Sequence, residues 1–201
     1  GDFENDPQTI PFDEDLQPIR PNYKGGPFVA FVLLSDENCD YEAIRKALSD
    51  DWGIVCRQSP ENGSLVFEHG GDLVAYNLIK GQVPDGEAQD NARNNYLWEG
   101  ALDAAEMHRS HLLVALVNHG ESPIDAGILH TKLVAAACRL DNVVGVYFTG
   151  TVVSPGSYLE EAEHIRKGTI PLLDWVWFGL YQSQEGCGGY TRGLKVFGKE
   201  E

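Results

Sequence analysis

The chain has 201 residues, of which 42% are apolar, and its 15 Lys and Arg against 31 Asp and Glu give a formal net charge of -16. With a mean hydropathy of -0.28 and a sequence pI near 4.6, this composition predicts a soluble globular protein with a hydrophobic core. It excludes nucleic acid and membranes as partners, because phosphates and anionic lipids attract basic surfaces and no apolar run approaches the ~20 residues that cross a bilayer.

Residues 1–27 differ from the rest of the chain and are expected to form an acidic, proline-rich N-terminal arm. Proline fixes φ and removes a hydrogen-bond donor, so neither a long helix nor a central strand is expected there. The arm is either a flexible tail or an extended segment that lies along the domain. Residues 28–201 are expected to form a single α+β domain. The prolines of the arm are Pro7, Pro11, Pro18, Pro21 and Pro27.

The segment 28–109 predicts strands and helices in the order β-α-β-β-β-α. Asp40 is placed to cap a helix, and the glycines of His69–Asp72 favour a hairpin turn. The expected elements are a buried strand at 28–34, a helix over 41–50, a strand at 53–56, a hairpin of strands 64–68 and 73–78, and a helix over 91–109.

The segment 110–198 predicts a second series of strands and helices. Ser122-Pro123 and Ser154-Pro155 each provide a capping side chain and a proline in the first turn of a helix. The expected elements are a strand at 111–118, a helix from 123, a strand at 143–148, a helix from 155 to near 168, and a hairpin of strands 175–181 and 190–197.

These elements together predict an α+β fold with a mixed sheet and helices packed on it. Val114–Val117 has a pattern similar to Val29–Val32. One alternative is therefore a fold of two pseudo-repeated ferredoxin-like halves, 28–109 and 110–198, each containing a βαβ unit. The other is a single α+β domain without internal repetition.

The cysteines Cys39, Cys56, Cys138 and Cys187 are far apart and form no C-x-x-C pair. Cys56 and Cys138 lie in apolar stretches, where a thiol behaves as a small buried apolar group. This usage predicts a reducing compartment, and hence the cytoplasm. Because the sequence begins with Gly1 rather than Met, export after removal of a signal peptide remains the alternative.

Three motifs that could carry chemistry have simpler structural interpretations. His108 and His111 flank the expected end of a helix, so their rings point in different directions and we expect no metal. The glycines of 186–189 precede a strand rather than a helix, which favours a turn over a phosphate-binding loop. The acidic cluster on the helix after 154 is expected to be a solvated face. Its members are Glu160, Glu161, Glu163 and His164. We expect no catalytic residues and no cofactor.

The best candidate for a ligand site combines a polar connection with a pair of tryptophans. The connection 147–154 joins a buried strand to a helix N-terminus, where free N–H groups can hold an anion. Aromatic side chains at alternate positions of the strand at 175–181 could form a wall of a pocket. The structural alternative is a capped helix beside a buried strand. The candidate ligand-binding residues are Tyr147, Thr149, Thr151, Ser154, Trp175 and Trp177.

Several apolar segments give residues 28–198 a resemblance to a known family. They are the strand at 28–34, Asp51-Trp52-Gly53-Ile54, Tyr96-x-Trp98, His108–Val114, and Gly145-Val146-Tyr147-Phe148 with Ser154-Pro155. With these segments the chain resembles the bacterial family catalogued as domain of unknown function 4261. The resemblance implies a bacterial protein and carries no activity, ligand, cofactor or catalytic residue.

These observations predict a binding or protein-interaction module rather than an enzyme. One alternative is an enzyme or small-molecule binder that uses the connection 147–154 and the side of the strand with Trp175 and Trp177. Another is an immunity-type protein that neutralises a basic protein partner, since a net charge of -16 would attract such a partner over long range.

Overall fold

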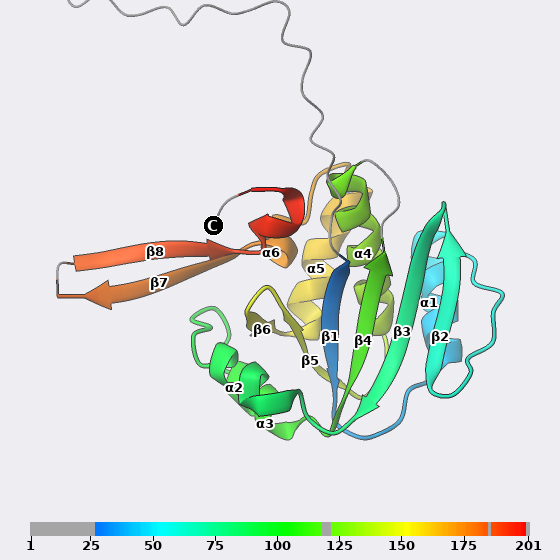
Figure 1. Cartoon of the computed structure of the whole chain (residues 1–201), viewed down its shortest axis with the longest axis horizontal. Coiled ribbons are helices and arrows are strands. Elements are labelled where there is room, and N and C mark those ends of the chain that lie inside the picture. The colour runs from blue at the N-terminus through cyan, green and yellow to red at the C-terminus, as the bar shows by residue number, and fades with distance from the viewer. Residues whose placement is uncertain (1–26, 118–121, 185, 200–201) are drawn as a thin grey trace, which may run out of the picture.

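The computed structural model describes residues 27–117, 122–184 and 186–199, which form one large sheet with helices on it and a separate hairpin (Figure 1). The predicted N-terminal arm, apart from Pro27, lies outside these residues. None of the helices in the described ranges is both long and apolar enough to cross a membrane.

The large sheet has six strands in the order β2-β3-β4-β1-β5-β6, and each neighbouring pair is antiparallel. Strand β1 lies between β4 and β5, with Phe28 opposite Leu116 and Phe31 opposite Tyr147. The strands are β1 (Phe28–Leu34), β2 (Ser64–His69), β3 (Asp72–Lys80), β4 (Ser110–Val117), β5 (Val143–Phe148) and β6 (Thr151–Val153).

The α+β class is confirmed, but the sheet is antiparallel throughout rather than mixed. Strands β4 and β5, which a long helix connects, do run in the same direction. They are not neighbours, because β1 is inserted between them and pairs antiparallel with both. The strands of the two expected halves are therefore interleaved in one sheet, with β1 of the first half between two strands of the second.

One face of the sheet is covered by three helices, α1 (Tyr41–Trp52), α4 (Pro123–Ala137) and α5 (Pro155–Arg166) (Figure 1). They form the main hydrophobic core with alternate residues of the strands, such as Val32 and Leu34 of β1. The buried Tyr76 hydroxyl donates a 2.8 Å hydrogen bond to the Leu133 carbonyl, which ties β3 to α4. Helix α5 packs against both α4 and strand β5.

The intervening strand residues point to the opposite face, where a smaller cluster contains Leu33 and Tyr147. Two short helices, α2 (Glu87–Ala92) and α3 (Ala101–Met107), cover this cluster after the 3-10 turn η1 (Pro84–Gly86). The expected single helix over 91–109 is thus wrong. The Asn95 side chain accepts hydrogen bonds from the backbone N–H groups of Leu97 and Trp98, and this turn separates α2 from α3.

The expected strand at 53–56 is also wrong. Gly53 ends α1 with a left-handed conformation (φ 67°), and its N–H bonds back to the carbonyls of the last helical turn. The chain then continues without regular structure to residue 60, although Ile54 and Cys56 are buried in the main core. The apolar pattern reflected this burial and not a strand.

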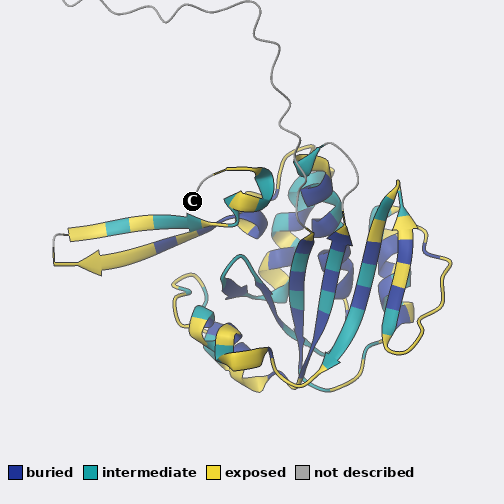
Figure 2. Ribbon diagram, in the orientation of Figure 1, coloured by how far each residue is buried: buried dark blue, intermediate teal, exposed yellow. Residues whose placement is uncertain are grey.

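Strands β7 (Trp177–Ser183) and β8 (Gly186–Arg192) form a hairpin that projects from the body and is largely exposed (Figures 1 and 2). It follows the short helix α6 (Leu172–Trp175) and leads into the 3-10 turn η2 (Leu194–Phe197). The glycine run expected as a turn is part of β8. Glycine is needed in this strand because a ring of the opposite strand packs over it: a Cβ on Gly188 would lie 2.4 Å from the Tyr181 ring.

Candidate functional site

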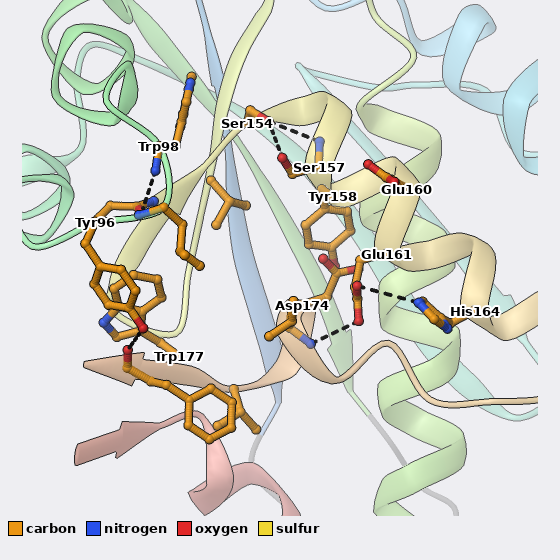
Figure 3. Close-up of a pocket in the computed structure, with 16 residues that line it drawn as sticks. Tyr96, Trp98, Ser154, Ser157, Tyr158, Glu160, Glu161, His164, Asp174 and Trp177 are labelled. Atoms are coloured by element: carbon orange, nitrogen blue, oxygen red, sulfur yellow. Dashed lines mark hydrogen bonds and ion pairs between the residues drawn. The ribbon is translucent and has the colours of Figure 1, made fainter. Parts of the chain in front are cut away.

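A cavity of about 410 Å³ lies between helix α5, the connection from α6 to β7, and the segment 95–98. Figure 3 shows Tyr96 and Trp177 on one side of it and Tyr158, Glu161 and Asp174 on the other. Three segments provide its lining: Asn95, Tyr96, Leu97 and Trp98; Val153, Ser154, Ser157, Tyr158, Glu160, Glu161 and His164; Leu173, Asp174, Val176, Trp177 and Phe178.

Helix α5 provides the polar side of the cavity. Its N-cap is Ser154, whose hydroxyl accepts a 3.0 Å hydrogen bond from the Ser157 backbone N–H. Residues three or four positions apart lie on one face of a helix, so Ser157, Glu161 and His164 project from α5 toward the same space. The cap fixes the first turn of α5, and the helical spacing then places these three side chains on the side of the cavity.

Asp174 is the most unusual group of the cavity. Only 5% of this residue is exposed, and among the described residues its Oδ2 atom has no hydrogen-bond partner. Burial, and secondarily the negative charge of Glu161, raises the pKa of Asp174 from 3.8 to about 9. The carboxyl group is therefore protonated and uncharged at neutral pH in the unliganded protein.

Glu161 is fixed in place beside Asp174. One of its carboxylate oxygens accepts a 3.2 Å hydrogen bond from the Leu173 backbone N–H, and the other lies 3.8 Å from the His164 Nε2 atom. The opposite nitrogen of the His164 ring is 3.2 Å from the Thr169 hydroxyl. These contacts join α5 to the start of α6 and hold a second carboxylate at the cavity.

Aromatic side chains form the opposite wall. The rings of Tyr96 and Trp177 are 5.2 Å apart between centroids and inclined at 43°. The Tyr96 hydroxyl donates a 2.7 Å hydrogen bond to the Phe178 carbonyl, so the segment 95–98 is attached to the base of β7. The Trp177 indole N–H is buried without an acceptor among the described residues. The wall thus combines apolar surface with an unused donor.

The predicted connection 147–154 does lead into α5 at its cap Ser154, but it does so through the hairpin of β5 and β6 rather than through a polar loop. Thr149 and Gly150 both have positive φ, 57° and 77°, and form the tight turn between β5 and β6. The Tyr147 hydroxyl donates a 2.5 Å hydrogen bond to the Glu87 carboxylate on the face of the sheet opposite α5. Thr151 is buried in β6. None of these three side-chain positions, 147, 149 and 151, lines the cavity.

The two predicted tryptophans are separated. Trp175 belongs to α6 and not to a strand. Its indole N–H donates a 2.8 Å hydrogen bond to the Thr131 hydroxyl, and its ring stacks on Phe197 with centroids 4.7 Å apart. Trp177 begins β7 and lines the cavity. Of the six candidate residues, the structure brings together only Ser154 and Trp177.

His108 and His111 each use a ring nitrogen in a contact with the backbone. The His108 Nε2 atom accepts a 2.8 Å hydrogen bond from the Val83 N–H, and the His111 Nδ1 atom lies 3.0 Å from the Gly81 carbonyl. Burial lowers the pKa of both rings. Within the described ranges, no cluster of three His, Cys, Asp or Glu side chains is arranged to hold a metal ion.

Sequence reasoning missed Asp174 and assigned Glu160, Glu161 and His164 to a solvated face, whereas all of them line the cavity. A signal for Asp174 is present, because it is the lone acid in the otherwise apolar run 171–178. A charged side chain in such a run must be paired, neutralised or functional. Tyr96 and Trp98, noted from the sequence only for the family resemblance, also line the cavity.

Comparisons of the chain with models of protein families, with curated proteins and with solved structures found no match. The resemblance to the domain of unknown function 4261 family therefore stays a prediction. What the arrangement can do follows from its chemistry: a neutral buried carboxyl donates or loses a proton, and a fixed carboxylate accepts hydrogen bonds.

Proposed function

We propose that the chain is a small-molecule-binding protein that holds its ligand in the cavity between α5, the segment 95–98 and the α6–β7 connection. The observation that carries this proposal is the buried Asp174 carboxyl with an oxygen that lacks a partner. Burial of a polar group without a hydrogen bond costs free energy. Asp174 lines the cavity, so a ligand toward which the carboxyl turns would supply the missing partner and recover that free energy on binding.

The size and lining of the cavity support the same function. Its volume of about 410 Å³ lies within the range of about 300–1,000 Å³ that is typical of small-molecule sites. Such sites are mostly apolar with a few convergent polar groups, as here, where Tyr96 and Trp177 face Glu161 and Asp174. Small-molecule binding was one alternative from the sequence; a protein-interaction role and a basic partner stay predictions.

Saturation-transfer NMR with mixtures of small neutral, cationic and anionic compounds tests the proposal. A Ser157→Trp variant should abolish binding, because position 157 lines the cavity from an exposed place on α5 and an indole there would fill the space. Lys167→Trp is the matched control, since Lys167 follows the same helix and does not line the cavity. If no compound binds, or if Ser157→Trp binds as well as the wild type, the proposal is wrong.

A further inference from the structure

The ionisable side chains that line the cavity are mostly acidic. Its titratable lining includes three carboxyl groups, Glu160, Glu161 and Asp174, and one histidine, His164, whereas no described lining residue is Lys or Arg. An anionic ligand would meet repulsion from the carboxylates of Glu160 and Glu161 and from the net charge of -16. A cation would be attracted by both.

The aromatic wall favours the same sign of charge. The face of an aromatic ring carries partial negative charge and attracts cations that lie within about 6 Å of its centroid. Tyr96 and Trp177 lie side by side across the cavity from Asp174 (Figure 3). A cationic head that lies between the rings and the carboxyl groups would therefore be attracted by both, and its aliphatic chain would gain apolar contact with the rings.

The unpartnered oxygen of Asp174 restricts further which cationic groups fit the cavity. In the ionised carboxyl that a cation selects, this oxygen is an acceptor only and needs a hydrogen-bond donor, which a quaternary ammonium group does not have and a primary ammonium or guanidinium group does. We infer, on the basis of the proposed function, that the ligand is an organic cation with N–H donors: a guanidinium or primary ammonium group on a short aliphatic chain. Its charged head lies between Asp174 and Glu161, and its chain lies against Trp177 and Tyr96.

Binding of such a cation requires Asp174 to give up its proton to solvent. Because the pKa of Asp174 is raised to about 9, the affinity should increase about tenfold per pH unit between about pH 6 and about pH 9 and then level off. The other titratable groups that face Asp174 are Glu161, His164 and Tyr158 from α5 and Cys138 after α4.

Isothermal titration calorimetry of the full chain with three probes of matched shape tests the inference. The probes are n-butylguanidinium, neutral n-butylurea and n-butyltrimethylammonium, and the guanidinium stays charged over the whole pH range. We expect n-butylguanidinium to bind at least about tenfold more tightly than either of the others at pH 8, with the pH dependence given above. Binding of n-butylguanidinium should release protons, which calorimetry detects as a binding enthalpy that changes with the ionisation enthalpy of the buffer.

Two variants and a control separate the contributions of the carboxyl groups. Asp174→Asn should weaken n-butylguanidinium binding at least about tenfold and remove its pH dependence while leaving n-butylurea unchanged. Glu161→Gln should weaken the same binding severalfold, which covers the case in which Asp174→Asn does not fold. Glu163→Gln is the control on α5, since Glu163 pairs with Arg166 and does not line the cavity.

The outcomes distinguish this inference from the proposed function. Equal or tighter binding of n-butylurea overturns the cationic ligand and leaves a small-molecule site in place. If a blocked Gly-Arg-Gly tripeptide binds more tightly than n-butylguanidinium, the guanidinium chemistry is supported, but the small-molecule function is overturned in favour of a basic side chain of a partner protein. Absence of binding by all probes and by the NMR mixtures overturns both.

Discussion

Asp174 makes the stability of this protein depend on pH in an unusual direction. Its carboxyl keeps a proton to about pH 9 in the folded chain, whereas an ordinary aspartate has a pKa of 3.8. Between these values the folded state binds one proton more than the unfolded state. The free energy of unfolding therefore falls as the pH rises, by at most ~1.4 kcal/mol per pH unit.

An Asp174→Asn variant should lose this dependence, because the amide does not titrate. We expect the variant to be more stable than the wild type near pH 8 and the difference to grow between about pH 5 and about pH 9. Urea unfolding at several pH values measures how the free energy of unfolding of the wild type and of the variant changes with pH. Glu163→Gln should keep the wild-type slope. A variant that is less stable than the wild type at every pH, with a parallel slope, would show that Asp174 is ionised and paired in the folded state.

At the scale of elements, the position of α4 depends on a glycine. Gly127 lies within α4, and a Cβ there would come within 2.9 Å of the Phe197 ring and 3.0 Å of the Trp175 ring. Gly156 lies in the first turn of α5, and a Cβ there would meet nothing within 4 Å. Both glycines are helical, but Gly156 faces open space whereas Gly127 faces two aromatic rings.

Alanine at these two positions should have opposite effects. In an open helix Gly→Ala stabilises by up to about 1 kcal/mol, so Gly156→Ala should raise the free energy of unfolding. Gly127→Ala should lower it by about 1–3 kcal/mol, because the rings of Trp175 and Phe197 must shift to admit the methyl group. Chemical denaturation of both variants provides the measurement. Stabilisation by Gly127→Ala would mean that η2 does not pack against α4 in solution.

Local signals explain which elements the sequence predicted well. The caps Asp40, Ser122 and Ser154 each accept a hydrogen bond from the N–H three residues later, as the spacing predicted, so α1, α4 and α5 begin where expected. The strands at 28–34 and 143–148 and the hairpin of β2 and β3 are likewise confirmed. Each of these signals is contained within a few residues of the chain.

Long-range packing explains what the sequence did not predict. The insertion of β1 between β4 and β5 depends on contacts between distant segments, and no local pattern determines it. For the same reason the sequence identified Ser154 and Trp177 but not the cavity between them. Asp174 is buried only because α6 folds against α5, and its role could not be derived from its immediate neighbours alone.

At the scale of the whole molecule, the projecting hairpin is the part with least support from the core. Leu180 in β7 is 70% exposed, and Tyr181 beside it is also exposed. A two-stranded hairpin is marginally stable on its own in water. Its two strands are joined by antiparallel backbone pairing, to which the rings of Tyr181 and Tyr190 add packing over glycines of the opposite strand.

Leu180→Ser should therefore change the free energy of unfolding by no more than about 0.5 kcal/mol. Leu116→Ala in β4, where the side chain is completely buried, should cost about 2–5 kcal/mol and serves as the reference. Denaturation at two protein concentrations measures both changes. A cost above about 2 kcal/mol for Leu180→Ser, increasing with concentration, would show that a second copy of the chain covers the hairpin.

The central position of β1 also matters while the protein is being made. Translation produces Phe28–Leu34 before either of its neighbours, and the pairing of Phe31 with Tyr147 must wait for most of the described chain to be synthesised. Both hydrogen-bonding edges of this apolar segment are open to other chains until Ser110–Val117 is made, and one of them stays open until Val143–Phe148 follows. Sheets that depend on such distant pairings fold slowly. A nascent chain that stalls before Val143 should therefore be prone to aggregate and should need a chaperone to protect β1 on the ribosome.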